Sequence, residues 1–140
     1  METSLYIIKP HGLIFREEVR EMIESEDLTI SEVKRVVVPR WALEIIYSDL
    51  PERYRNSVFK PFVNTPVEIG LVVGKDAVNT LLRITGTEID PVNCSPESIR
   101  FKFGARKPIM IDGVIYYKNI IHRPRNREEA RHDVEVFHML

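Results

Sequence analysis

The 140-residue sequence contains a single cysteine, almost no net charge and no long apolar run. The lone Cys94 cannot form an internal disulfide, and no Cys/His spacing typical of a zinc site accompanies it. Because no base neighbours Cys94 in the sequence, we interpret it as an incidental thiol. A reducing compartment is the simplest expectation, and the chain is long enough to bury a core without disulfides.

The near-zero net charge and the lack of long apolar runs exclude further classes of protein. A net charge of -1 argues against broad, non-specific binding of nucleic acid, so any anion site must be local. No apolar stretch approaches membrane-spanning length, and the first residues lack the charged-then-apolar pattern of a signal region. We therefore expect a cytoplasmic protein with no membrane span, in which residues 1–140 form one domain.

Strand-like and helix-like patterns alternate along the chain. Strands are predicted at 5–8, 28–38, 65–73 and 119–122. Amphipathic helices are predicted over 15–25 and after Gly74, and two short helices over 41–59. The order strand, helix, strand, then strand, helix, strand predicts an α+β sandwich of the ferredoxin-like βαββαβ type, in which helices pack on a four-stranded antiparallel sheet. Capping side chains are predicted for three helices: Asp76, Ser95 and Asn126.

A polar stretch near the C-terminus is the first candidate for chemistry. Two isoleucines separate Asn119 from His122, so His122 is expected where a short buried strand leaves the core. The helix that opens at Asn126 carries Asp133, which could fold back and orient the imidazole. Taken alone, a histidine in this setting is more often a packed or surface residue than a nucleophile.

The beginning of the chain adds a second motif. The segment Ser4-Leu-Tyr-Ile-Ile-Lys9-Pro-His-Gly12, followed far downstream by Asn119-Ile-Ile-His122, resembles the "IKPDG" and "NxxH" segments of the nucleoside diphosphate kinase family. The resemblance extends from about residue 4 to residue 137, with separated segments in the same order. His11 occupies the position where the family usually has Asp, and the sequence assigns it no role.

The resemblance implies a function and a set of site residues. His122 would accept the γ-phosphate of a nucleoside triphosphate as a phosphohistidine and pass it to a nucleoside diphosphate, with Asp133 holding the ring and Lys9 assisting. Magnesium bound through the nucleotide phosphates and a homo-oligomer, a dimer-based tetramer or hexamer, are implied in the same way. The implied nucleotide-binding residues are Lys9, Tyr47, Tyr54, Val58, Arg83, Thr87, Arg100 and Asn119.

The sequence also departs from the family pattern. The loop from Gly86 to Pro91 is one residue longer, so either Thr87 or Ile89 would stand where the family has a phosphate-binding threonine. An insertion over 101–118 contains Asp-Gly between two β-rich runs, which predicts a hairpin near 108–117. Pro124 stands at the position where the family usually has a serine. The arginines at 123, 125 and 127 either favour an anionic ligand or form a solvated basic loop.

These departures favour an alternative, a nucleotide-binding sensor or regulatory protein with weak or lost kinase activity. A third hypothesis, a ferredoxin-like module that binds nucleic acid, requires exposed aromatic side chains on the sheet and a basic face. The sequence lacks that alternating aromatic and basic pattern. The kinase hypothesis is preferred because the residues that match the family are retained together: Lys9, Tyr47, Arg83, Arg100, Asn119 and His122.

Overall fold

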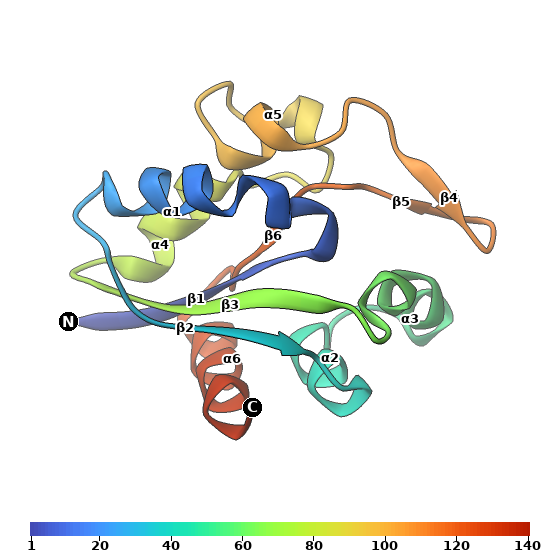
Figure 1. Ribbon diagram of the computed structural model, residues 1–140, viewed down its shortest axis with the longest axis horizontal. Helices are drawn as coiled ribbons and strands as arrows, with labels where there is room; N and C mark the ends of the chain where they lie inside the picture. Colours follow the sequence, from blue (N-terminus) through green and yellow to red (C-terminus); the bar gives the residue numbers. More distant parts are fainter.

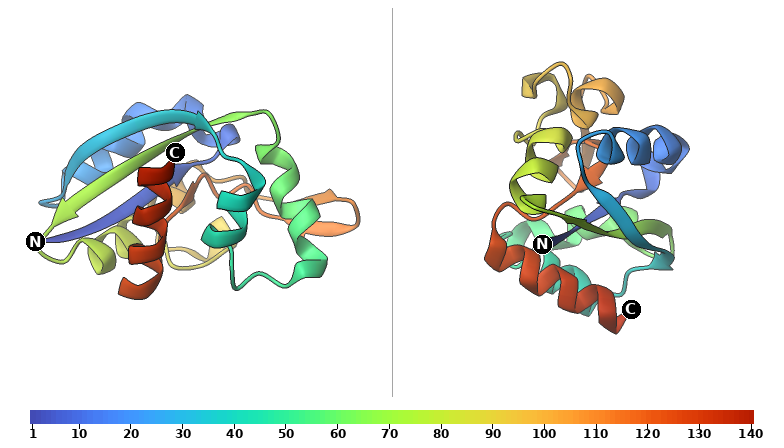
Figure 2. Two further views of the ribbon diagram at one scale, coloured as in Figure 1. Left: turned by 90° about the horizontal axis from the view of Figure 1, so that it is seen from below. Right: turned by 90° about the vertical axis from the view of Figure 1, so that its left-hand side faces the viewer.

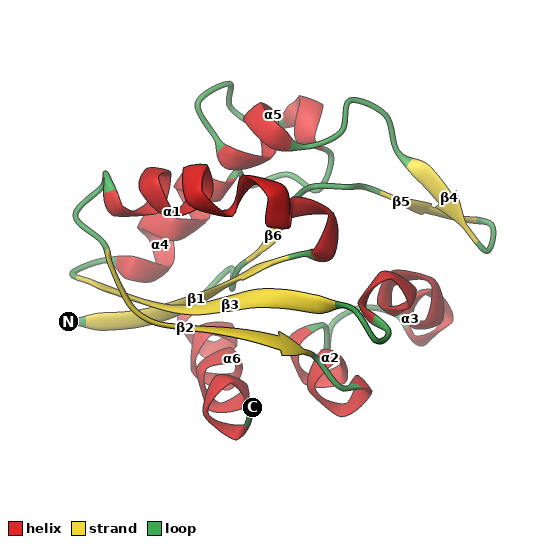
Figure 3. Cartoon of the chain, viewed as in Figure 1, coloured by secondary structure: helices red, strands yellow, loops and turns green.

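The computed structural model describes residues 1–140 and contains a four-stranded sheet with helices on both faces (Figures 1 and 3). The strand order is β2-β3-β1-β6, and every neighbouring pair is antiparallel. This arrangement confirms the predicted α+β, ferredoxin-like fold. The strands are β1 (Glu2–Ile8), β2 (Thr29–Val37), β3 (Pro66–Gly74) and β6 (Ile121–His122).

The central strand β1 is buried on both faces, and the sheet separates two hydrophobic cores. Leu5 and Ile7 point into one core, whereas Tyr6 and Ile8 point into the other, as the two-residue period of a strand requires. The right-hand view of Figure 2 shows helices on both sides of the strands. Helices α1 (Arg16–Glu24), α4 (Ala77–Thr85) and α5 (Ile99–Phe103) lie on the Tyr6 side; α2 (Arg40–Ile46), α3 (Glu52–Phe59) and α6 (Arg127–Met139) lie on the other.

One of the three predicted helix caps is confirmed, and two are wrong. The Asn126 side chain accepts a hydrogen bond from the Glu129 amide over 2.9 Å, as expected. Asp76 precedes α4 but caps no backbone amide, because Glu2 from β1 accepts from the Val78 amide instead. The helix after Ser95 starts only at Ile99, and a different serine, Ser98, caps it.

The inserted hairpin is present where the sequence predicts it. Strands β4 (Ile109–Ile111) and β5 (Val114–Tyr116) pair antiparallel and project from the body of the molecule on the same side as α3 (Figure 1). Asp112 and Gly113 both have positive φ, 50° and 79°, which is the requirement of a two-residue type I′ turn. None of the helices in the structure is long and apolar enough to cross a membrane.

Candidate functional site

A cleft of about 970 Å³ lies between the α2–α3 helix pair and the inserted hairpin. Its inner wall is formed by the C-terminal end of β1, by β6 and by the loop over 87–90. The structure therefore gathers residues from six separate stretches of sequence at one place. The predicted site residues that line the cleft are Lys9, Tyr47, Tyr54, Val58, Thr87, Arg100, Asn119 and His122.

His122 ends strand β6 and is held by a carboxylate from α6. Its Nε2 lies 3.0 Å from Oδ2 of Asp133, which is itself 2% exposed. Because an ionised carboxylate can only accept, Nε2 carries the hydrogen and Nδ1 keeps its lone pair. Burial lowers the pKa of His122 despite the opposing effect of Asp133, and Lys9 and Arg123 lower it further. The ring is therefore neutral near pH 7, with one nitrogen fixed and the other available as a nucleophile.

The backbone before His122 contains a strained turn. Ile120 has a φ of 78°, and the Ile121 amide donates to the Asn119 carbonyl over 2.9 Å, closing a three-residue turn around it. A β-branched residue at positive φ is an outlier that persists only when its surroundings hold it. The Lys9 amide donates to the Ile120 carbonyl over 2.8 Å, and the Ile120 amide donates to Nε2 of His11 over 3.0 Å.

His11 therefore has a structural role that the sequence did not reveal. Its Nε2 acts as an acceptor, so the ring must be neutral for the hydrogen bond to form. Burial lowers the pKa of His11 to about 4, and Lys9 and Lys118 contribute to the decrease. The adjacent Gly12 cannot carry a side chain without a shift of the turn, because a Cβ there would lie 2.9 Å from the Ile120 carbonyl oxygen.

Three buried basic side chains line the cleft together with the imidazole and have no carboxylate partner. Lys9, Arg100 and Arg123 are 7%, 5% and 5% exposed, and none of them forms a salt bridge. Burial lowers the pKa of Lys9 to about 7, and the positive charges of Arg100 and Arg123 add to the decrease. Buried charges normally have partners of opposite sign, so this arrangement suits an anionic ligand.

Neutral groups hold each of these cations in place. Lys9 Nζ donates to Asn119 Oδ1 over 2.7 Å, and the Asn119 amide nitrogen donates to the Ile89 carbonyl over 3.0 Å. Arg100 donates through Nη1 and Nη2 to two backbone carbonyls, each over 2.8 Å. All the acceptors are uncharged, so the positive charge at the cleft is oriented but not neutralised.

Arg83 is the one predicted nucleotide-binding residue that the structure does not bring to the cleft. It points away from α4 toward Glu26, with Nη2 3.4 Å from the carboxylate and a side chain that is 64% exposed. Arg123 instead reaches the C-terminal end of α4, where Nε donates to Thr85 Oγ1 over 2.8 Å and Nη2 to the Gly86 carbonyl over 2.7 Å.

The three basic positions after His122 thus differ in character. Arg123 is buried and lines the cleft, which excludes a solvated role for it. Arg125 lies at the rim and pairs with Asp49 and Glu129, and Arg127 is exposed and pairs with Glu2. The only sequence signal for the buried role of Arg123 is its position directly after a strand-end histidine.

Helix α3 and the loop over 87–90 also line the cleft. Tyr54 and Val58 lie one helical turn apart and face the cleft together, and the Arg53 guanidinium stacks on the Tyr54 ring 4.6 Å from its centroid. Thr87 and Ile89 both reach the cleft, so the structure leaves both alternatives for the lengthened loop in place.

Three buried polar atoms in cleft residues have no hydrogen-bond partner. They are the hydroxyls of Tyr47 and Tyr116 and Nε of Arg100. The Tyr47 ring packs against His122 with 5.0 Å between ring centroids, and burial followed by the nearby Tyr116 raises the pKa of Tyr47. Tyr116 comes from the inserted hairpin, and sequence reasoning did not identify it as a site residue.

Comparisons with known proteins agree with this geometry. The model of the family "Nucleoside diphosphate kinase" matches residues 2–139. No curated protein gives a significant match to the sequence. Among solved structures, nucleoside diphosphate kinase from Encephalitozoon cuniculi is 26% identical with a TM-score of 0.81, over 98% of this chain and 88% of that one.

Two bacterial structures share the fold at lower identity. Nucleoside diphosphate kinase from Aquifex aeolicus is 22% identical with a TM-score of 0.79, over 97% of this chain and 94% of that one. A transition-state mimic of the Borrelia burgdorferi enzyme with bound vanadate and ADP is also 22% identical, with a TM-score of 0.81 over 97% and 86% of the two chains. With a family model that spans nearly the whole sequence, the chain belongs to the nucleoside diphosphate kinase family.

Proposed function

We propose that the protein transfers the γ-phosphate of a nucleoside triphosphate to a nucleoside diphosphate through a phosphohistidine at His122. The observation that carries this proposal is the neutral imidazole with Nε2 fixed by Asp133 and Nδ1 free, placed among three buried cations that have no carboxylate partner. The Borrelia burgdorferi relative, which was solved with ADP and vanadate, supports nucleotides as the ligands.

The reaction has two symmetric steps. Nδ1 of His122 attacks the γ-phosphorus, an N–P bond forms, and the bond to the β,γ-bridging oxygen breaks, so that a nucleoside diphosphate leaves. A terminal oxygen of a second diphosphate then attacks the phosphohistidine, and the N–P bond breaks. Asp133 keeps the hydrogen on Nε2 and stabilises the positive charge that the ring acquires.

The cations provide most of the catalysis in this proposal. Lys9, Arg100 and Arg123 would bind the phosphate oxygens, where charge is concentrated in the transition state. Guanidinium groups suit polyphosphates because they donate through a planar fork, and they stay protonated even where burial lowers their pKa. Tyr54 and Val58 would contact the base, and Asn119 would position the ribose and phosphate end against Lys9.

Magnesium would enter with the nucleotide. No three His, Cys, Asp or Glu side chains lie close enough together to hold a metal ion. Magnesium commonly binds through substrate phosphates and keeps several of its waters, so a cleft lined with phosphate-binding cations fits this mode. The ion would neutralise phosphate charge, whereas the residues of the chain bind and orient the nucleotide.

A homo-oligomer is proposed alongside the activity. Strand β2 lies at an edge of the sheet, and Val33 and Val37 on it are exposed, as are Trp41 and Ile45 on the following helix. Apolar side chains along an unpaired edge favour association with another chain. Light scattering on the purified protein measures the assembly, and a monomer at micromolar concentration would refute it.

The alternative function is a nucleotide sensor with weak or lost phosphoryl transfer. The observation that favours it is Arg83, which the structure turns toward Glu26 and away from the cleft. Binding of nucleotide by the remaining cations without transfer would then be the biological signal. Both functions predict nucleotide binding, so only a measurement of the covalent intermediate separates them.

The test is a labelling and chase experiment with Mg²⁺ and γ-labelled ATP. We expect the wild type and the control His132→Ala, an exposed position on α6, to acquire acid-labile and alkali-stable label that moves to added GDP. His122→Ala should acquire none. ATP binding without label on the wild type would reject the kinase and favour the sensor.

A further inference from the structure

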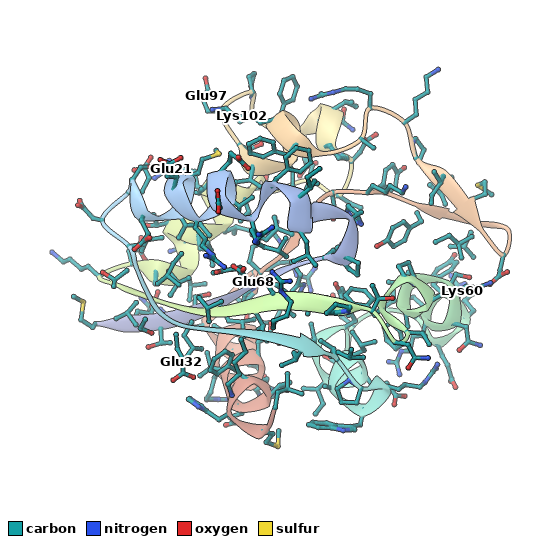
Figure 4. The ribbon with its side chains drawn as sticks, viewed as in Figure 1. Glu21, Glu32, Lys60, Glu68, Glu97 and Lys102 are labelled. Atoms are coloured by element: carbon teal, nitrogen blue, oxygen red, sulfur yellow. The ribbon has the colours of Figure 1, made fainter.

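The inserted hairpin forms one wall of the nucleotide cleft. Residues 113–117 line the cleft from one side, and Tyr54 and Val58 of α3 line it from the other. The tip of the hairpin lies close to the end of α3, where Figure 4 labels Lys60. Asp112 Oδ2 lies 3.3 Å from Lys60 Nζ. This ion pair is exposed and therefore weak, so it guides the hairpin toward α3 without fixing it there.

Tyr116 is the hairpin residue that reaches deepest into the site. It is 5% exposed, its ring centroid lies 5.9 Å from Lys9 Nζ, and the His11 ring meets it edge-on at 6.2 Å. Lys9 belongs to the cation cluster around His122, so the Tyr116 ring lies at the phosphate end of the cleft. Tyr54 and Val58, which are proposed above to contact the base, line the cleft from α3.

The Tyr116 hydroxyl is buried but has no hydrogen-bond partner. Such groups are rare in folded proteins because burying a hydroxyl without a hydrogen-bond partner is destabilising. Three of the four unpartnered side-chain atoms in the structure belong to cleft residues, and two of these residues, Tyr47 and Arg100, are among those already proposed to bind nucleotide. The exception, Ser4, lies outside the cleft. The unmet hydrogen bonds therefore gather where a ligand would supply acceptors.

The chemistry of the missing partner follows from the surroundings. Burial raises the pKa of Tyr116 to about 12, so its hydroxyl remains a donor throughout the physiological range. The neighbouring groups, Lys9 and the hydroxyl of Tyr47, also favour an acceptor that carries negative charge. A phosphate oxygen meets these requirements, and the ring of Tyr47 packs against the imidazole that faces the terminal phosphate.

We infer that the inserted hairpin is part of the substrate site and that Tyr116 donates a hydrogen bond to the terminal part of the nucleotide's phosphate chain. The inference rests on the nucleotide binding proposed above but not on phosphoryl transfer. It gives the insertion a specific role, which is to bring a neutral hydrogen-bond donor close to Lys9 at the phosphate end of the cleft.

The test is equilibrium binding by calorimetry of two probes in the presence of Mg²⁺, β,γ-imido-ATP and AMP. Tyr116→Phe removes only the hydroxyl, so we expect about tenfold weaker binding of β,γ-imido-ATP and unchanged binding of AMP. The control Met110→Ala alters an exposed hairpin residue that does not line the cleft, and it should bind both probes like the wild type. Thermal melts of all three proteins check that the hairpin variants fold.

Each other outcome overturns the inference in a recognisable way. Wild-type affinity of Tyr116→Phe for both probes would show that the hydroxyl does not bind the phosphates. An equal loss for AMP and β,γ-imido-ATP would place Tyr116 at the nucleoside instead. Because β,γ-imido-ATP does not pass on its terminal phosphate, these results are independent of the labelling experiment, and either proposal can fail while the other stands.

Discussion

The guanidinium of Arg123 lies at the C-terminal end of α4, whereas the side chain of Arg83, a residue of α4, points away from the cleft. The Arg123 guanidinium donates to the Gly86 carbonyl over 2.7 Å, while Arg83, on the last turns of the same helix, pairs with Glu26 outside the cleft. The two arginines are therefore a matched pair, one facing the proposed phosphates and one facing solvent.

The first prediction compares these two arginines. Arg123→Ala should lower kcat/KM for phosphoryl transfer about tenfold or more, because a charge-assisted contact to phosphate is lost. Arg83→Ala should stay within about twofold of the wild type, since an exposed ion pair contributes little. A coupled assay of diphosphate phosphorylation measures both variants. The reverse order of effects would mean that Arg83 swings into the cleft when nucleotide binds.

The second prediction concerns the tautomer of His122. In Asp133→Asn the amide can donate to Nε2, which would move the ring hydrogen to Nδ1 and remove the nucleophilic lone pair. We expect formation of phosphohistidine to slow by about 100-fold, a typical effect of losing correct proton placement. Binding of β,γ-imido-ATP should be unchanged. Rapid-quench labelling gives the rate, and an undiminished rate in Asp133→Asn would exclude the proposed role of the carboxylate.

The third prediction uses the pKa of Lys9. In the folded protein this pKa falls to about 7 from an ordinary value near 10.5, so without ligand the folded state binds fewer protons than the unfolded state between those limits. Stability of the free protein should therefore rise with pH from about 7 toward 10.5, relative to Lys9→Met. Bound phosphate favours charged Lys9, so nucleotide binding at pH 8 should take up a proton.

Two measurements test the behaviour of Lys9. Urea unfolding of the wild type and Lys9→Met across this pH range isolates the contribution of the lysine to stability. Calorimetry of β,γ-imido-ATP binding in buffers of different ionisation enthalpy counts the protons taken up. Equal binding enthalpies in all buffers at pH 8 would show that Lys9 is already charged in the free protein.

The fourth prediction concerns His11, which accepts from the strained turn. His11→Ala leaves the Ile120 amide without its acceptor, so we expect a loss of about 1–3 kcal/mol of stability and slower labelling of His122. His11→Gln offers an amide oxygen in its place and should recover part of both. If all three proteins label at the same rate, the hydrogen bond has no influence on the nucleophile.

Acid should weaken the same hydrogen bond. The pKa of His11 falls from an ordinary value of 6.5 to about 4 in the folded state, so the unfolded chain binds the additional proton first. Stability associated with His11 is therefore complete above about pH 6.5 and decreases as the pH falls toward 4. Denaturant unfolding between these values, with His11→Gln as the reference, measures the decrease.

The sequence predicted features that local pattern determines. The strands, the Asp112–Gly113 hairpin and the Asn126 cap follow from hydrophobic period and turn chemistry within a few residues. The contact of Asp133 with His122 was also anticipated, because a strand end and the following helix are close in sequence. These features required no knowledge of the tertiary fold.

Features that depend on distant contacts were missed. Glu2 displaces Asp76 as the cap of α4 because β1 begins beside that helix, which the local sequence cannot show. His11 accepts from an amide 109 positions away, and Arg123 is buried against Thr85 and Gly86 across the chain. Arg83 pairs with Glu26, which lies 57 positions earlier in the chain, and the order of motifs along the sequence does not predict this contact.

The turn at Ile120 also restricts how this protein can change by mutation. Glycine would relieve the positive φ, but Ile120 is 2% exposed, and removing its side chain would leave a cavity in the core beside α1 and α4. Cavity formation of this kind costs about 2–5 kcal/mol, more than the roughly 1–3 kcal/mol of strain that would be released. Isoleucine at position 120 is therefore a local optimum, and glycine there lowers the stability of the folded protein. A tolerated substitution of Ile120 would first require changes in the core residues that pack around it.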